Sequence, residues 1–218
     1  MGTEIQNVGY LATPATGTGS GVIILQEWWG LVPHIKSVAD RFAKAGYVAL
    51  APDLYHGETT TSPDEAGRLF MALNIEQTAE SLKSAIDFLL NHETVSSTQV
   101  GVVGFCMGGQ LALLAGTVSN QIGAVVDFYG IHPNVSPNFA NLTAPVLGIF
   151  GDQDTFVPPD AVLALEKAIR DAGGQIETHT YANADHAFFN DTRPEVYNPT
   201  AAADAWERTL AFLKGAIA

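Results

Sequence analysis

Cys106 is the residue in this sequence whose type and surroundings point most directly to chemistry. It is the only cysteine among 218 residues and lies within the glycine-rich stretch GFCMGG. An apolar, β-branched run precedes it at residues 100–103, and a small-residue helical pattern follows Met107. This order predicts a strand–turn–helix that raises a nucleophile on a cramped turn, where close neighbours must lack a Cβ atom. A small buried cysteine in a glycine-rich turn is the non-catalytic alternative.

A catalytic thiol needs a base, and a histidine held by a carboxylate supplies one. His186 is the one histidine that follows the last predicted strand in a turn, with aspartates upstream. The order nucleophile, acid, histidine is that of α/β-hydrolases. Asp152 and Asp154 follow the same predicted strand, so their spacing leaves both open as the acid. A solvent-exposed loop histidine is one alternative interpretation. A divalent metal site that adds Asp185 is another, although it lacks a close histidine pair or a second cysteine.

The elements that must position these side chains alternate between strands and helices along the whole chain. Strands are predicted at residues 4–12, 22–25, 48–51, 100–103, 124–128, 146–150 and 176–181, with helices from Pro33 to Gly46, at 63–73 and 76–90, after Met107, from Pro158-Pro159 to Gly173-Gly174, and from Asn198-Pro199 onward. Because no linker, repeat or low-complexity segment interrupts them, residues 1–218 are predicted to form a single α/β domain. Its mostly parallel central sheet should carry helices on both faces.

Five polar side chains follow strands of this predicted sheet, at the point where each strand ends. They are Glu27, Cys106, Asp152, Asp154 and His186. In open parallel sheets, ligands bind beyond the carboxyl ends of the strands. The five side chains are therefore expected to reach the same edge of the sheet.

Composition limits the kinds of partner that the protein could bind and the cellular compartment in which it could fold. The formal net charge is −13 with only 10 lysines and arginines, which argues against nucleic acid as a partner. A single cysteine excludes an internal disulfide and fits a reducing compartment. No secretory signal pattern opens the sequence, and no apolar run approaches the roughly 20 residues that span a bilayer. The expectation is a soluble, cytoplasmic protein without a membrane partner, either a monomer or a weak homo-oligomer.

The chain resembles the dienelactone hydrolases (carboxymethylenebutenolidases) of the α/β-hydrolase superfamily. The motifs that carry the resemblance occur in the family's order and span nearly the whole chain: QEWWG at 26–30, APDLYHG at 51–57, GFCMGG at 104–109, GDQDTFVP at 151–158 and ADHAF at 184–188. The resemblance implies an α/β-hydrolase fold with Cys106 as nucleophile, Asp154 as the acid and His186 as the base. It implies no cofactor and no metal.

The resemblance also implies roles for the QEWWG segment. Glu27 would contact the thiol and help to generate the thiolate when substrate binds, because a carboxylate beside a thiol disfavours the thiolate until it is moved or neutralised. The backbone N–H groups of Trp28 and Met107 would form the oxyanion hole. A strand-end glutamate facing water, and an aromatic residue that only packs, are the alternative interpretations.

The sequence departs from the family where a substrate carboxylate would bind. Asn190 lies four residues past His186, at a place where the family has an arginine. Arg193 or Arg68 could replace it, although each could equally be a solvated surface arginine. The function expected is a hydrolase that opens a dienelactone-type lactone or cleaves a small ester. The alternatives are a broad carboxylesterase or thioesterase, a non-catalytic small-ligand-binding protein, and a redox sensor using Cys106.

Overall fold

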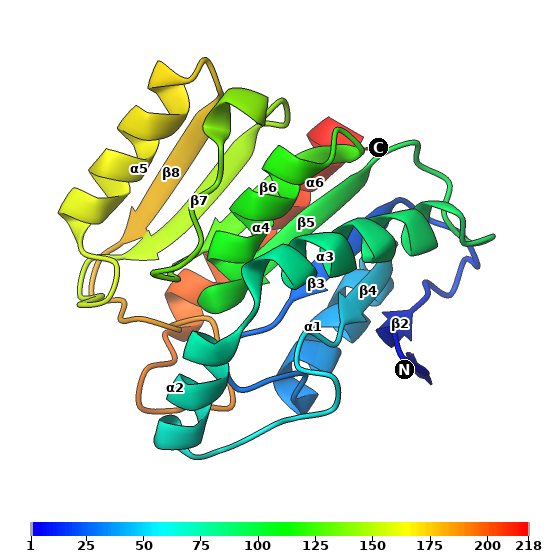
Figure 1. Ribbon diagram of the computed structural model, residues 1–218, viewed down its shortest axis with the longest axis horizontal. Coiled ribbons are helices and arrows are strands. Elements are labelled where there is room, and N and C mark those ends of the chain that lie inside the picture. The colour runs from blue at the N-terminus through cyan, green and yellow to red at the C-terminus, as the bar shows by residue number, and fades with distance from the viewer. Residues whose placement is uncertain (1, 218) are drawn as a thin grey trace.

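The strands pair into one eight-stranded sheet in the order β1-β2-β4-β3-β5-β6-β7-β8 (Figure 1). The computed structural model describes residues 2–217. The strands are β1 (Thr3–Ile5), β2 (Gly9–Ala12), β3 (Gly21–Leu25), β4 (Val48–Pro52), β5 (Val100–Phe105), β6 (Ile122–Phe128), β7 (Val146–Gly151) and β8 (Ile176–Tyr181). The pairs from β4 across to β8 are all parallel, and only β1 and β2 run antiparallel to their neighbours. The predicted mostly parallel sheet is confirmed.

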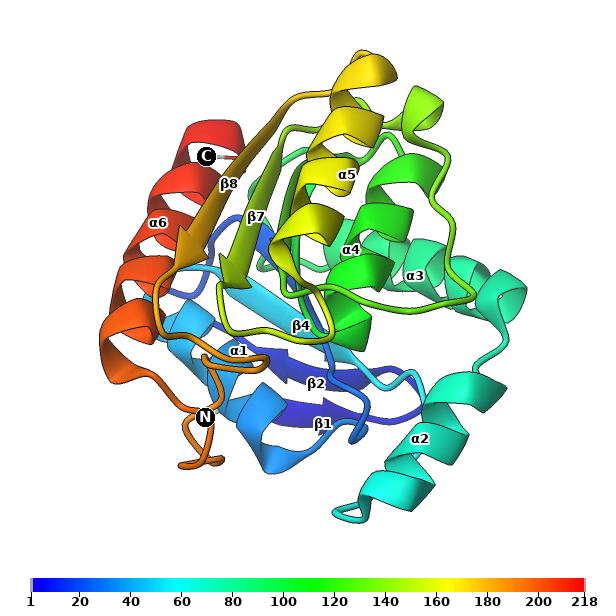
Figure 2. The ribbon, with the colours of Figure 1, turned by 90° about the vertical axis from the view of Figure 1, so that its left-hand side faces the viewer.

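Helices cover both faces of the sheet. They are α1 (Pro33–Lys44), α2 (Pro63–Ala72), α3 (Ile75–Leu90), α4 (Met107–Val118), α5 (Pro159–Asp171) and α6 (Pro199–Ile217), with a short 3₁₀ turn, η1 (Phe139–Asn141). Figures 1 and 2 show α1 and α6 on one face and α3, α4 and α5 on the other. On the first face, the rings of Phe42 in α1 and Trp206 in α6 lie 4.6 Å apart. The two-sided cover explains why the central strands read as continuous apolar runs.

The first predicted strand is wrong in one respect, because residues 4–12 form a hairpin instead of a single strand. β1 and β2 pair antiparallel, and the chain reverses around Asn7, whose φ is 61°. Gly9 has a φ of 146°, and a Cβ atom there would lie 2.1 Å from the Ala51 carbonyl oxygen. A glycine is therefore needed for the hairpin to press against β4.

Helix ends agree with the proline and asparagine signals in the sequence. α5 begins at Pro159, and α6 begins at Pro199 directly after Asn198. The Asn198 side-chain oxygen accepts a hydrogen bond of 3.1 Å from the Ala201 amide, which caps the first turn of α6. These boundaries set the length of the loop after β8.

The segments after β3, β5, β7 and β8 come together at the carboxyl edge of the sheet. α2 reaches this edge as well, since the Nε2 atom of His132, in the loop after β6, lies 3.0 Å from the Phe70 carbonyl oxygen. The polar side chains predicted to follow the strands therefore share one region with α2. Within residues 2–217, none of the helices is long and apolar enough to cross a membrane.

Candidate active site

Cys106 occupies a strained position between β5 and α4. Its φ of 54° and ψ of −117° are unusual for a residue with a side chain. Its amide donates a hydrogen bond of 3.0 Å to the Phe128 carbonyl, and its own carbonyl accepts one of 3.1 Å from Ile131. A Cβ atom on Gly104 would lie 1.8 Å from the Gly108 carbonyl oxygen. Backbone bonds and missing side chains together hold the turn, which agrees with the expected strand–turn–helix.

The end of β3 packs directly against the start of α4. A Cβ atom on Gly108 would lie 2.4 Å from the Leu25 carbonyl oxygen and 2.6 Å from that of Gln26. This approach brings the segment after β3 beside the Cys106 turn. The backbone N–H groups of Trp28 and Met107 donate no hydrogen bond to any of the residues described. Both donors are thus available to a ligand.

His186 is hydrogen-bonded to Asp154 and not to Asp152. The distance from His186 Nδ1 to Asp154 Oδ2 is 2.7 Å. Asp154 Oδ1 accepts two further bonds, of 2.8 Å from the Phe156 amide and 2.9 Å from the Val157 amide. Asp152 is exposed and instead accepts a bond from the Asn183 amide. The spacing in the sequence left both aspartates open as the acid, whereas in the structure only Asp154 contacts His186.

The surroundings of His186 favour its protonated form. Burial lowers the pKa of the imidazole, but hydrogen bonds to Asp154 and Cys106, together with the charges of these groups, outweigh burial and raise the pKa to about 10. Nδ1 faces Asp154, which leaves Nε2 as the ring nitrogen available to Cys106 in the cavity that both residues line. His186 thus joins the thiol to a carboxylate that emerges from a different strand.

Glu27 is almost fully buried, and its carboxyl group accepts a hydrogen bond from a single donor. The Asn190 Nδ2 atom donates to Glu27 Oε2 at 2.8 Å, and Glu27 Oε1 has no partner among the described residues. Burial raises the pKa of Glu27, against smaller lowering effects of His34, Asn190, His186 and Arg193. Burial at this position therefore disfavours the charged carboxylate.

Asn190 is engaged at both ends of its amide group. While Nδ2 donates to Glu27, the Asn190 Oδ1 atom accepts bonds from the Thr192 amide and hydroxyl at 3.1 Å and 2.6 Å. Its side chain therefore links the loop after β8 to Glu27 in the loop after β3. Asn190 is not among the residues that line the cavity containing Cys106.

A cavity of about 610 Å³ opens over the Cys106 turn. Cys106, His186, Trp28 and Arg193 all line it. Asp154 lies behind His186, whereas Arg68 lines a different pocket and forms ion pairs with Glu58 and Glu65. The structure thus brings together the predicted thiol, histidine and acid, but it separates Arg68 from them.

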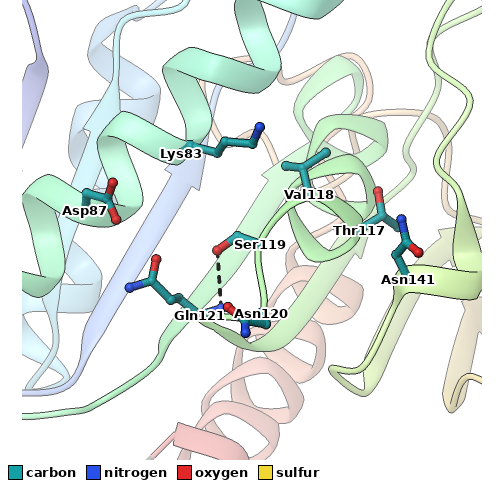
Figure 3. Close-up of a pocket in the computed structure, with 8 residues that line it drawn as sticks. All are labelled: Lys83, Asp87, Thr117, Val118, Ser119, Asn120, Gln121 and Asn141. Atoms are coloured by element: carbon teal, nitrogen blue, oxygen red, sulfur yellow. Dashed lines mark hydrogen bonds between the residues drawn. The ribbon is translucent and has the colours of Figure 1, made fainter.

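A second cavity, at the other end of α4, has a different character. Its volume is about 430 Å³, and Figure 3 shows Lys83, Asp87 and the polar segment Ser119–Gln121 around it. The Ser119 hydroxyl accepts a bond of 3.2 Å from the Gln121 amide. No histidine or cysteine lines this cavity, so the first cavity is the candidate active site.

Two buried residues near the site were not found by sequence reasoning. Tyr129 has a φ of 42°, its ring lies 5.1 Å from that of His186, and its hydroxyl has no partner among the residues described. Asp127 is fully buried in β6, and neither carboxyl oxygen has a hydrogen-bond partner there. A signal for Asp127 was present, because a lone acid interrupts an otherwise apolar strand.

The metal alternative has no support in the site's geometry. Asp152 and Asp185 are exposed, while Asp154 is occupied by His186 and two backbone amides. Within residues 2–217, no group of three or more histidine, cysteine, aspartate or glutamate side chains is arranged to hold a metal ion.

The arrangement of sheet and site defines the α/β-hydrolase fold: a turn with Cys106 after β5, an acid after β7 and a histidine after β8. The chain belongs to the dienelactone hydrolase family, whose sequence model matches residues 8–217. It is accordingly a carboxylic-ester hydrolase of the dienelactone hydrolase type.

Individual relatives match over nearly their whole length. Protein usf of Aquifex pyrophilus is 39% identical over 213 residues, covering 94% of this chain and 92% of the relative. A protein of Aquifex aeolicus, provisionally named carboxymethylenebutenolidase, is 32% identical over 213 residues with the same two coverages, 94% and 92%. A crystal structure from Klebsiella pneumoniae, provisionally described as a dienelactone hydrolase, superposes with a TM-score of 0.86 at 31% identity over 98% of this chain and 97% of its own.

Proposed function

We propose that this hydrolase opens a lactone of the dienelactone type or cleaves a small ester through a triad of Cys106, His186 and Asp154. One observation carries the proposal: His186 is hydrogen-bonded to Asp154 and lines the same cavity as Cys106. The names of relatives support it, since one from Bradyrhizobium is provisionally called a lactonase. All proposed groups follow strands of one sheet, which supports a single catalytic domain. The proposed reaction uses a small-molecule substrate and no cofactor.

In the first half of the reaction, the Cys106 thiolate attacks the acyl carbon of the substrate. The bond from sulfur to carbon forms, and the carbonyl oxygen takes the negative charge, which the Trp28 and Met107 amides stabilise. When the bond to the leaving oxygen breaks, His186 donates its proton to that oxygen. The raised pKa of His186 supports this role, because the imidazole then carries a proton at neutral pH.

In the second half, water releases the acyl group from sulfur. His186, now neutral, takes a proton from the water, and the resulting hydroxide attacks the thioester carbon. The bond from carbon to sulfur breaks, which restores the thiolate and the imidazolium. Asp154 holds the ring through Nδ1 throughout, and its two backbone donors fix the carboxylate in turn.

Glu27 acts in this proposal through its charge. A neutral Glu27 leaves the thiolate unopposed, whereas an ionised Glu27 would disfavour it. Burial supports the neutral form, and it outweighs the hydrogen bond from Asn190 and the nearby His34, which favour the charged form. Where Glu27 is ionised, a substrate that displaces its carboxylate would help to generate the thiolate in the same way.

The test compares the wild type with Cys106→Ala on a dienelactone and on a simple acetate ester. We expect Cys106-dependent hydrolysis of at least one of the two, and circular dichroism should show an unchanged fold in the variant. Lactone opening in preference to the ester would give the dienelactone activity, and the reverse would give the esterase activity. Equal rates for the wild type and Cys106→Ala would overturn the mechanism, and absent turnover with saturable binding would favour a ligand-binding protein.

A further inference from the structure

The walls of the Cys106 cavity are mostly apolar. Six of the side chains that form them are Trp28, Phe70, Ile131, Phe156, Val157 and Leu165. Phe156 is 63% exposed although it is aromatic, and its ring lies 5.1 Å from that of His186. An exposed aromatic ring beside the histidine offers a contact surface to a ligand. The cavity volume and lining suit a small molecule with an apolar body.

The arginine that lines the cavity has its charge already matched. Arg193 Nε donates a hydrogen bond of 2.8 Å to Glu195 Oε1, and the guanidinium lies 5.8 Å from the centre of the Trp29 ring. An arginine in such an ion pair offers less attraction to a substrate carboxylate than a free one. Glu195 engages only Nε, but a carboxylate that approached the Arg193 Nη groups would also face the negative charge of Glu195.

The other polar groups of the lining are bound to the backbone. His132 Nε2 lies 3.0 Å from the Phe70 carbonyl oxygen, and its Nδ1 accepts a bond of 3.1 Å from the Asn134 amide. Burial lowers the pKa of His132, so its ring is neutral at neutral pH. The Gln110 amide donates to the Val135 carbonyl at 3.2 Å. Neither side chain supplies a positive charge to the cavity.

The remaining candidates for a carboxylate-binding group lie elsewhere. Asn190 is uncharged and bridges Glu27 and Thr192. Arg68 belongs to another pocket, and Glu58 and Glu65 share its charge. Among the described residues, the two cationic side chains that line the Cys106 cavity, Arg193 and His186, thus each already have a carboxylate partner, Glu195 and Asp154.

From this cavity we infer that the enzyme selects esters and lactones with an apolar, uncharged body and disfavours the same substrates when they carry a free carboxylate. This inference rests on the proposed function. The apolar walls stabilise a hydrocarbon body by removing it from water. A carboxylate in the same place loses its hydration and meets only cations that already have a carboxylate partner.

The main experiment uses two nitrophenyl esters matched in length, one of hexanoic acid and one monoester of adipic acid. We expect kcat/KM to favour the hexanoate by at least about tenfold, because the adipate end carries the charge into the apolar cavity. Within the neutral series from acetate to hexanoate, kcat/KM should rise by up to about fourfold per buried methylene. Equal or higher kcat/KM for the adipate ester would overturn the inference.

A charge variant tests the role of the ion pair at the wall. Glu195→Gln releases Arg193, and we expect it to raise kcat/KM for the adipate ester by about twofold to fivefold with little change for the hexanoate. The matched control is Glu58→Gln, which loosens Arg68 in the other pocket and should leave both values unchanged. An adipate rate unaffected by Glu195→Gln would overturn the inference, since charge at the wall would then not set the preference.

A binding measurement separates this inference from the proposed chemistry. In Cys106→Ala, hexanamide and adipamic acid are titrated by tryptophan fluorescence, because Trp28 lines the cavity. Tighter binding of hexanamide supports the inference, and tighter binding of adipamic acid overturns it. Loss of all Cys106-dependent turnover, by contrast, overturns the proposed function and leaves this binding comparison to decide the cavity's preference.

Discussion

Two acids reach the candidate site from different strands, and their surroundings differ sharply. Asp154, in the loop after β7, accepts hydrogen bonds from two backbone amides and from His186. Glu27, in the loop after β3, accepts one bond from Asn190 and leaves Oε1 without a partner in the described residues. Three donors stabilise a carboxylate, whereas one donor in a buried place does not. The two loops thus give the same functional group very different hydrogen-bonding surroundings.

Asp127 extends this comparison to a carboxyl group without any donor. It lies in β6 beneath the start of α4, where a Cβ atom on Gly109 would be 2.3 Å from its Oδ1. Burial raises the pKa of Asp127 to about 7, and the nearby Gly130 backbone and the charge of His186 offset this only in part.

The largest expected effect comes from the acid with three donors. In the proposed mechanism, Asp154→Asn removes the negative charge that orients and stabilises the His186 imidazolium, so kcat should fall by about 10³-fold to 10⁴-fold. Steady-state kinetics on the preferred ester measures this loss. Asp152→Asn is the matched control and should change kcat little, because Asp152 does not contact His186. Equal losses in the two variants would reject Asp154 as the acid.

The acid without donors should make stability depend on pH. The pKa of Asp127 is higher in the folded chain than its ordinary value of 3.8, so the folded state holds this proton longer. The free energy of unfolding should therefore fall as the pH rises from about 4 to about 7, by up to roughly 1.4 kcal/mol per pH unit, and level off above. Urea unfolding of wild type and Asp127→Asn across this range isolates the contribution as a difference.

The control for this measurement is Asp87→Asn, which changes an exposed acid. It should keep the pH dependence of the wild type. A wild-type curve that stays parallel to that of Asp127→Asn from pH 4 to pH 7 would show that Asp127 does not hold its proton in the folded chain.

The fold could be predicted from the sequence because its signals are local. Continuous apolar runs mark the central strands, and Pro159 and Asn198-Pro199 mark where two helices begin. The hairpin at the N-terminus was missed because its turn depends on the left-handed conformation of Asn7 and on the close packing of Gly9 against β4. Neither feature changes the apolar pattern of the segment.

The sequence predicted which residues form the candidate site, but not which of them contact one another. Chain order pointed to a thiol, an acid and a histidine, yet only the folded turn decides that Asp154 and not Asp152 meets His186. The sequence also left Arg68 open, because its partners Glu58 and Glu65 become visible only when loop and helix are placed together. Which groups pair is a tertiary property.

A smaller effect is expected where Glu27 loses its only donor. Asn190→Ala removes the bond to Glu27 and also the acceptor for Thr192, so the free energy of unfolding should fall by about 1–3 kcal/mol. Chemical denaturation at neutral pH measures the change. Asn120→Ala, at an exposed position, is the control and should stay within about 0.5 kcal/mol of the wild type. A similar result for both variants would mean that the Asn190 bridge contributes nothing.

The smallest effect is expected at Glu27 itself. If burial keeps Glu27 neutral, Glu27→Gln replaces one neutral group by another, and the new side chain still offers Asn190 an acceptor. We expect kcat/KM to stay within about tenfold of the wild type, equivalent to less than about 1.4 kcal/mol. A loss as large as that of Asp154→Asn would show instead that Glu27 accepts a proton during the reaction.

The single thiol allows active sites to be counted by chemical labelling. Cys106 is the only cysteine in the sequence and is 8% exposed at the floor of the cavity. A thiol reagent therefore labels one place per chain, and after denaturation the label count equals the number of chains. The ratio of label taken up under native conditions to that taken up in denaturant gives the fraction of intact sites in a preparation. Turnover numbers can then be stated per working site instead of per milligram of protein.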